Sequence, residues 1–353
     1  MQYINPELLI EIDEKKEAIE NFDLAACVRR FLETESNAHS NLIDDSTLTN
    51  GAQDSVTITQ RMKKKLIEQQ EEEERVTLEN LTNAWKWAIA NYNGELNRRF
   101  VEEVARQIEP ERADVRRGYR TENVSIRGEE VMLPPRYEKV HGMMEELFLE
   151  VYTGDMHPIE KAALVHFHIV RIHPFTEGNG RTSRLLQNLL LRYEGYAPAT
   201  IKSTEKREYF TLLRKAMDAY KQRRGDGNGG YGRSYIDNLE RGGVSIEERA
   251  FFDYLAEKVK DEFTRAEAIL QTLSEYKLTL TRVKERTFIF EIKRALDGYF
   301  RAGHIGNARL TDSKSGVYII KGDIQESNIG EIVSQIGTKT SGTLIKYSVK
   351  RIK

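Results

Sequence analysis

The chain has 353 residues, 39% hydrophobic and 31% charged, and its 54 basic side chains nearly cancel its 56 acidic ones. This balance argues against nucleic acid or another bulk polyanion as a partner. The single cysteine, Cys27, excludes an intramolecular disulfide and a cysteine metal cluster. No stretch reaches the roughly 18 apolar residues of a membrane span, and no signal-peptide pattern opens the sequence. We therefore expect a cytoplasmic protein without a membrane segment.

The first segment, residues 1–80, is predicted to be an N-terminal helical region. Apolar spacing indicates a first helix near 17–35. Residues 36–58 are rich in Ser, Asn, Asp and Thr, whose side chains compete for backbone hydrogen bonds, so we expect mostly turns and short helix there. The Lys- and Glu-rich run at 61–75 is typical of a solvated helix.

The second segment, residues 81–225, has the pattern of a helical core. Apolar side chains recur at helical spacing in three consecutive stretches, 137–152, 158–172 and 179–193. The second stretch opens on a proline, which suits the first turn of a helix, and a glycine and a proline follow the third. A further helix is expected at 205–222.

A short β-hairpin is predicted within residues 118–135, just before these helices. Val124 and Ile126 alternate with polar residues on one side of Arg127-Gly128, and Val131 and Leu133 do so on the other. Two prolines then end the pattern, because proline cannot continue a strand ladder.

The last two segments are a helical extension, 226–280, and a small C-terminal module, 281–353. A glycine-rich connector precedes the extension. A capping box of Ser245 and Glu248 indicates where the helix of the extension begins. β-rich patterns from about residue 281 predict a mixed α/β module. The fold class expected from the whole sequence is mainly α with this small mixed module at the end.

The segment most informative about chemistry is HPFTEGNGRTSR, residues 173–184, between the second and third helices of the core. Gly178, Asn179 and Gly180 stand directly before a helix. Glycines there allow successive backbone N–H groups to converge, and the positive end of the helix dipole adds to them. The spacing therefore predicts an anion cradle.

Four side chains beside this cradle suggest phosphate chemistry. Arg181 and Arg184 lie in the first helical turn, where they oppose the dipole unless a polyanion compensates, so a phosphorylated ligand is indicated. Glu177 supplies the lone carboxylate typical of a Mg²⁺ site completed by phosphates and water. His173 has the near-neutral pKa range of a general base.

Purely structural interpretations remain open for each residue alone. Glu177 could form an ordinary ion pair with Arg181 or Arg184, and His173 could cap its own helix. For His166 and His168, which lie on the buried face and flank of the preceding helix, packing and solvent exposure respectively are favoured over metal binding.

The segment resembles the signature of Fic (filamentation induced by cAMP) proteins, HPFx(D/E)GNGRxxR, at every specified position. The flanking phrases AALVHFHIVRIHPF and LLRYEGYAP and the preceding hairpin are similar to the rest of the Fic core, over roughly residues 80–225. The resemblance implies a Fic-type helical core with a hairpin flap. It also implies transfer of AMP from Mg-ATP to a Ser, Thr or Tyr hydroxyl of a target protein.

The resemblance also assigns roles. His173 would deprotonate the target hydroxyl, and Glu177 would hold Mg²⁺ against the α- and β-phosphates. Backbone amides and the side chain around Gly178, Asn179 and Gly180 would stabilise the developing charge. Arg181 would engage the inner phosphates and Arg184 the γ-phosphate. The flap residues, Val124, Ser125 and Ile126, would add a strand to the target segment, although Val124 and Ile126 could equally be core residues.

Many Fic proteins carry an inhibitory helix, (S/T)xxxE(G/N), whose glutamate pairs with the second signature arginine. The candidate here is Ser36-Asn-Ala-His-Ser40-Asn41, with Ser40 where the glutamate belongs. Either the chain is not inhibited in the usual way, or another acid such as Glu33 or Glu35 substitutes, or the segment is only a polar turn.

The functional hypothesis is thus a Mg²⁺-dependent protein adenylyltransferase with ATP as co-substrate and a target protein as partner, with a homo-oligomer possible. One alternative keeps the fold but transfers another phosphate-containing group or removes AMP. Another, of a different class, is a helical module that binds a nucleotide or phosphoprotein without chemistry. An intact base and metal ligand, His173 and Glu177, argue against the last.

Overall fold

The computed structural model describes residues 2–20, 25–44, 60–126, 133–224, 243–281, 286–302, 304–312, 317–340 and 346–352. The chain divides into two compact units. The first comprises residues 1–16 and 33–262, and the second comprises residues 17–32 and 263–353. Within the described ranges, no helix combines the length and apolar character needed to cross a bilayer.

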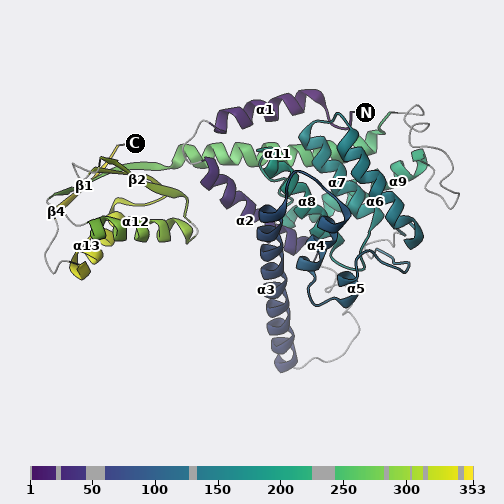
Figure 1. Cartoon of the computed structure of the whole chain (residues 1–353), viewed down its shortest axis with the longest axis horizontal. Coiled ribbons are helices and arrows are strands. Elements are labelled where there is room, and N and C mark those ends of the chain that lie inside the picture. The colour runs from purple at the N-terminus through teal and green to yellow at the C-terminus, as the bar shows by residue number, and fades with distance from the viewer. Residues whose placement is uncertain are drawn as a thin grey trace. The chain divides into compact units, whose positions relative to one another are not determined.

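The first unit is helical (Figure 1). Its elements are α1 (Pro6–Glu20), α2 (Ala25–Asp44), α3 (Gln60–Asn91), α4 (Arg98–Ile108), α5 (Ala113–Arg116), α6 (Tyr137–Thr153), α7 (Pro158–Ile172), α8 (Asn179–Tyr193), η2 (Ser203–Glu205), α9 (Lys206–Arg224) and α11 (Ile246–Thr272). Three of these helices, α1, α2 and α11, also contribute residues to the second unit.

Helix α7 is the centre of this unit, and it packs against α6 and α8 (Figure 1). Every residue from Ala162 to Ile172 is buried, so the helix is enclosed on all sides. Pro158 occupies its first turn, and the ring of His157 accepts a hydrogen bond from the backbone N–H of Ile159 at 3.2 Å. The expected helices at 137–152, 158–172 and 179–193 are confirmed.

The N-terminal helices differ from the prediction. The structure has α1 over residues 6–20 and α2 over 25–44 in place of one helix at 17–35. Residues 36–44 are helical although their polar composition favoured turns. Four of them, Ser36, Asn37, Ser40 and Asn41, are buried against other parts of the unit, and tertiary packing of this kind overrides local propensity. Residues 45–59 lie outside the described residues.

Two further expectations concern connecting segments. The capping box is confirmed, because the N–H of Ser245 donates to Glu248 and the N–H of Glu248 donates to the Ser245 hydroxyl, both at 3.1 Å. Residues 225–242, which include most of the glycine-rich connector, lie outside the described residues, as do 127–132 of the expected hairpin.

The second unit contains a four-stranded antiparallel sheet, and its elements follow the order β-α-β-β-α-β. They are β1 (Ser274–Thr281), α12 (Arg286–Arg301), β2 (Gly306–Asp312), β3 (Val317–Gly322), α13 (Glu326–Thr340) and β4 (Lys346–Arg351). The strand order is β2-β3-β1-β4, which is the split β-α-β arrangement of ferredoxin-like folds. The first strand begins at Ser274, before the predicted β-rich boundary at 281.

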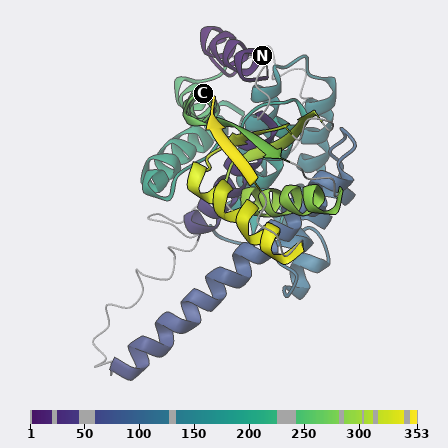
Figure 2. The ribbon, with the colours of Figure 1, turned by 90° about the vertical axis from the view of Figure 1, so that its left-hand side faces the viewer.

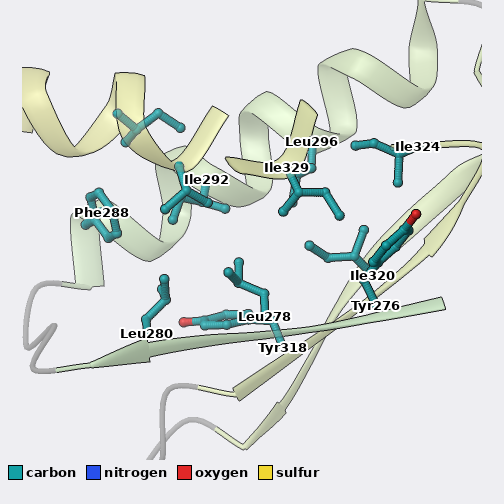
Figure 3. Close-up of a cluster of buried hydrophobic side chains, with 12 residues drawn as sticks. Tyr276, Leu278, Leu280, Phe288, Ile292, Leu296, Tyr318, Ile320, Ile324 and Ile329 are labelled. Carbon is teal, nitrogen blue, oxygen red and sulfur yellow. The ribbon is translucent and has the colours of Figure 1, made fainter. Parts of the chain in front are cut away.

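Both helices of the β-α-β-β-α-β segment cover one face of the sheet (Figures 2 and 3). Figure 3 shows side chains of β1 and β3 directed toward α12 and α13, where they form a single apolar layer. Leu278 and Ile320 of the strands and Ile329 of α13 are fully buried in this layer. Because alternate residues of a strand point to opposite faces, the sheet is a two-layer structure with one face covered by helices.

Candidate active site

The predicted base, His173, stands at the carboxyl end of α7 in a left-handed backbone conformation with φ 54° and ψ 59°. It is the only residue other than glycine with positive φ in the described part of the chain. Its Nδ1 lies 3.4 Å from the carbonyl oxygen of Val170. A carbonyl can only accept, so this contact favours the proton on Nδ1 and leaves the lone pair on Nε2.

Arg120 holds the backbone around His173. Its Nε donates to the carbonyl of His173 at 2.8 Å, and its backbone N–H donates to the carbonyl of Pro174 at 2.8 Å. The same guanidinium also donates to the carbonyl of Glu122 at 2.9 Å and to that of Pro135. Arg120 is 4% exposed, and burial lowers the pKa of its guanidinium. One side chain therefore joins the strained base to both ends of the expected flap.

The loop between α7 and α8 is closed by Asn179. Its Oδ1 accepts from the backbone N–H of Phe175 at 2.9 Å, and its Nδ2 donates to the carbonyl of the same residue at 2.8 Å. Phe175 is fully buried and anchors the loop. The side chain of Asn179 is thus engaged inside the loop, and its buried position points to a role in shaping the cradle.

Gly178 is the N-cap of α8 and has φ 75°, a conformation that glycine adopts without a steric cost. Its carbonyl accepts from the N–H of Thr182 at 2.9 Å, which begins the helix. A Cβ placed on Gly178 would lie 2.9 Å from Cγ of Glu109. The glycine therefore allows both the turn and the close approach of Glu109, while Gly180, half-buried, lies inside the first turn.

Arg181 pairs with Glu109, the residue that ends α4. Both side chains are largely shielded from water, with 14% and 17% of their surface exposed. The carboxylate of Glu109 lies beside Gly178 at the N-terminus of α8, and it places a negative charge where the cradle was predicted to attract one. An anion thus lies beside Arg181 and the N-terminus of α8, and it is the carboxylate of Glu109.

Arg184 is buried against α2. Its Nε donates to the hydroxyl of Ser40 at 2.8 Å, and its Nη2 donates to the backbone carbonyl of Ser40 at 2.9 Å. One turn away on each helix, the side-chain amide of Asn188 donates to the Ser36 hydroxyl at 3.0 Å. Asn41, the last residue of the motif, donates from Nδ2 to the carbonyl of Glu74 in α3 at 3.2 Å.

The candidate inhibitory segment is therefore a helix that contacts the second signature arginine through a serine. The alternative of a polar turn is wrong for residues 36–44. Glu33, one of the acids considered as a substitute, pairs with Arg192 two turns further along α8.

Glu177 is on the exposed side of the loop and pairs with Arg112 at 2.9 Å. Both side chains are about half exposed, so the pair contributes little and the carboxylate can exchange partners. The described residues contain no cluster of three or more His, Cys, Asp or Glu side chains able to hold a metal. One carboxylate beside a phosphate cradle fits Mg²⁺, which takes most of its ligands from phosphate oxygens and water.

The start of the expected flap lies close to the site. Asn123 accepts a hydrogen bond from the N–H of Tyr137 through Oδ1 at 3.1 Å, which fixes the segment to the beginning of α6. Val124 and Ile126 are half-buried and Ser125 is exposed, and Ile126 forms a single β-bridge. Because 127–132 lie outside the described residues, target docking by this segment stays a prediction.

The two histidines inside α7 are both buried, so the expectation of solvent exposure for His168 is wrong. His168 accepts from Nε of Arg171 at 3.1 Å. His166 contacts Oε1 of Gln187 through Nδ1 and the hydroxyl of Tyr209 at 2.9 Å through Nε2. Burial first, and then the charge of Arg184, lower the pKa of His166 to about 3. The enclosed position of α7 leaves no solvated flank for either ring.

The structure thus brings together His173, Glu177, the cradle and both arginines around the junction of α7 and α8. Sequence reasoning missed Arg120, Glu109 and Arg112, which contact signature residues from α4, α5 and the segment after them. An arginine whose partners are backbone carbonyls has no recognisable pattern in a single sequence. Glu109 precedes a proline at a helix end, which is equally ordinary.

The helical core, with the signature loop between its central helices α7 and α8, has the features of a Fic protein. Comparison with known proteins points to the same class. The family model of the Fic/DOC family matches residues 94–191. Residues 94–191 are therefore similar to a Fic/DOC domain, and α4 to α8 make up most of that stretch.

Curated relatives match part of the chain. Protein adenylyltransferase Fic of Nematostella vectensis is 38% identical over 98 residues, which are 28% of this chain and 23% of that protein. Protein adenylyltransferase Fic of Drosophila willistoni is 46% identical over 67 residues, 19% of this chain and 14% of that protein. The matched stretches thus span less than a quarter of these relatives.

Solved structures share the fold. A Fic domain containing signaling protein from Bacteroides thetaiotaomicron aligns with a TM-score of 0.51 and 22% identity, over 74% of this chain and 97% of that one. A Fic family protein from Desulfovibrio desulfuricans aligns with a TM-score of 0.52 and 16% identity, over 88% and 83%.

Proposed function

We propose that this protein is a Mg²⁺-dependent protein adenylyltransferase that transfers AMP from ATP to a hydroxyl side chain of a target protein. The observation that carries the proposal is the junction of α7 and α8, where His173, whose Nδ1 lies 3.4 Å from the Val170 carbonyl oxygen, precedes the turn at Gly178 and the arginines Arg181 and Arg184. The names of the curated relatives, which are adenylyltransferases, support the same reaction.

In the proposed reaction, Nε2 of His173 takes the proton of the target hydroxyl. The hydroxyl oxygen forms a bond to the α-phosphorus of ATP while the bond to the β-phosphate oxygen breaks, and pyrophosphate leaves. Base catalysis of this kind contributes about 10²–10⁴-fold, and preorganised charge at the site contributes the rest. The strained backbone of His173 is held by Arg120, so the base does not have to be reoriented during the reaction.

The phosphates would lie over the N-terminus of α8. Arg181 would engage the inner phosphates after exchanging Glu109 for them, and Arg184 would engage the γ-phosphate. When bound, Mg²⁺ would neutralise charge on the phosphate oxygens, and Glu177 would hold it after leaving Arg112. The exchange at Arg181 has the larger cost, because Glu109 is largely shielded from water and would be left beside the phosphates, whereas the exposed pair of Glu177 and Arg112 separates easily.

Ser40 bears on access to the γ-phosphate site. A glutamate at this position would neutralise Arg184 and compete with the phosphate, whereas a serine brings no charge to it. The hydrogen bonds that Arg184 donates to Ser40 can be exchanged for hydrogen bonds to phosphate oxygens. We therefore propose that α2 leaves the nucleotide site usable without activation.

The test uses ATP labelled at the α-phosphate, Mg²⁺ and a matched cell extract. Label is expected on an extract protein with the wild-type chain and not with His173→Ala. His304→Ala serves as a matched control, because His304 is exposed in the second unit. Parallel reactions use ATP labelled at the γ-phosphate.

Three outcomes overturn the proposal. Transfer of γ-label would indicate kinase-like chemistry. ATP binding without transfer of either label would indicate the non-catalytic module. Loss of label from a protein already carrying AMP, without transfer from ATP, would indicate the reverse reaction.

A further inference from the structure

The sheet of the second unit has one face that the helices α12 and α13 do not cover. Side chains at Tyr276, Leu278 and Leu280 of β1 point into the apolar layer beneath those helices (Figure 3). The intervening residues of β1, Lys277 among them, therefore point to the opposite face. The alternation in β3 is the same, with Ile319 on the open face.

This open face is basic. We call the four cations on it, Lys277, Arg309, Lys321 and Lys350, the basic face. Lys277, Arg309 and Lys350 are exposed and Lys321 is half-buried. Two carboxylates stand at described open-face positions: Glu275, which pairs with Lys321, and Asp312, which pairs with Val317 beyond a shift in strand register. Because the whole chain has a net charge of −2, this concentration of positive charge is local.

The strand register places three of these cations in one row across the sheet. Lys277 pairs directly with Lys350 of β4 on one side and with Ile319 of β3 on the other, and Ile319 pairs with Arg309 of β2. With strands about 4.8 Å apart, the row spans roughly 14 Å. Like charges directly opposite each other destabilise a sheet, so Lys277 and Lys350 have a cost that an anionic partner would remove.

A shallow cavity adjoins the row. It has a volume of about 250 Å³ and is lined by Glu275, Asn307, Ala308, Arg309, Ile319 and Lys321. Two cations, one carboxylate and an isoleucine are thus among the residues that line a space of side-chain size. This space can accept one short side chain of a bound peptide. That side chain would either have an apolar stem or be adjacent in the peptide to an acidic residue.

We propose that the basic face binds an extended, acidic segment of a partner protein. Charge complementarity carries the proposal, and Ile319 at the centre of the row adds an apolar contact. Single-stranded nucleic acid fits less well, because sheet platforms for it stack bases on aromatic side chains, and the described open-face positions contain none. This inference is independent of the proposed adenylyl transfer.

The test measures binding of a short fluorescein-labelled peptide rich in Glu and Asp, with a central Leu, to the full chain by fluorescence anisotropy at low ionic strength. The double variant Lys277→Glu with Lys350→Glu is expected to weaken binding about tenfold or more. The control, Lys293→Glu with Arg294→Glu, makes the same charge change at exposed positions of α12 and is expected to change binding less than about twofold.

Comparison probes decide the remaining alternatives. The same peptide with Gln and Asn in place of its acids is expected not to bind. A labelled single-stranded oligo-dT that binds more tightly than the acidic peptide would overturn the choice of partner. Equal weakening by both double variants would show an effect of overall charge, and no binding of the acidic peptide would also overturn the proposal. The variant Lys277→Gln with Lys350→Gln, expected to be intermediate, excludes a defect of folding.

Discussion

Arg120 donates a hydrogen bond of 2.8 Å to the backbone carbonyl of His173, the residue that adopts a left-handed conformation at the end of α7. The same guanidinium binds the carbonyls of Glu122 and Pro135, on either side of the expected flap. A backbone in this region of φ and ψ costs about 1–3 kcal/mol unless its surroundings fix it. The position of the base therefore depends on a residue 53 positions earlier.

The substitution Arg120→Lys is expected to lower the rate at saturating ATP about 10- to 100-fold, because one ammonium cannot hold three separated carbonyls. The KM for ATP should change little, since the hydrogen bonds of the Arg120 guanidinium reach the carbonyls of Glu122, Pro135 and His173, which lie outside the cradle. Arg117→Lys, at an exposed position nearby, is the control. An unchanged rate for Arg120→Lys, or a loss matched by the fraction of unfolded protein, would contradict the positioning role.

Ser40→Glu is expected to block the proposed γ-phosphate site at Arg184. A carboxylate at this position would pair with Arg184, which is buried and now contacts the Ser40 hydroxyl. ATP affinity, measured by calorimetry, should fall about tenfold or more, since displacing a buried partner from arginine is costly. Ser40→Gln has the same size without the charge and should lose much less affinity. Equal losses in both variants would show that crowding, not charge, is responsible.

Gly178→Ala is expected to destabilise the first unit by about 1–2 kcal/mol and to weaken ATP binding. The residue has φ 75°, and the added Cβ would press on Glu109, the partner of Arg181. Gly142→Ala is the matched control, because Gly142 lies within α6 with nothing within 4 Å of a new Cβ. That variant should gain about 0.5–1 kcal/mol. If Gly178→Ala is as stable as the wild type, the close approach of Glu109 is not a constraint.

His166 predicts a loss of stability in acid. Its folded-state pKa is lowered to about 3, by burial first, from 6.5, so the unfolded chain binds a proton that the folded chain does not between these values. The contribution is fully present above pH 6.5 and is lost as the pH falls toward 3. From pH 6.5 to 5 the loss is about 2 kcal/mol.

The measurement compares wild type with His166→Gln. Both tryptophans, Trp85 and Trp87, lie in α3, so their fluorescence follows the first unit during denaturant unfolding. The variant should be less stable at pH 7.5, because it changes the contacts with Gln187 and Tyr209, but its stability should depend less on pH. Parallel pH dependences for the two proteins would show that His166 is protonated in the folded state.

Sequence reasoning predicted the parts of the site whose causes are local. Helical periodicity placed α6, α7 and α8 to within about a residue of their ends, since an apolar stripe and terminal Pro or Gly are written in consecutive positions. It did not predict that 36–44 is helical, because Ser36 and Ser40 find their partners on α8, more than 140 positions away. A separation of 72 positions likewise hides Glu109 from Arg181.

By itself, the sequence determined which chemical groups stand at the junction of α7 and α8: a histidine, a carboxylate, two arginines and a glycine-bounded helix start. Only the tertiary structure decided what holds and occupies them, namely Arg120 on the His173 carbonyl, Glu109 on Arg181 and Ser40 on Arg184. It also decided, through strand register, that Lys277 and Lys350 stand side by side. The physical reason is that a local sequence pattern specifies local conformation. These contacts instead join groups far apart in the sequence, which only helix packing or strand pairing brings close together.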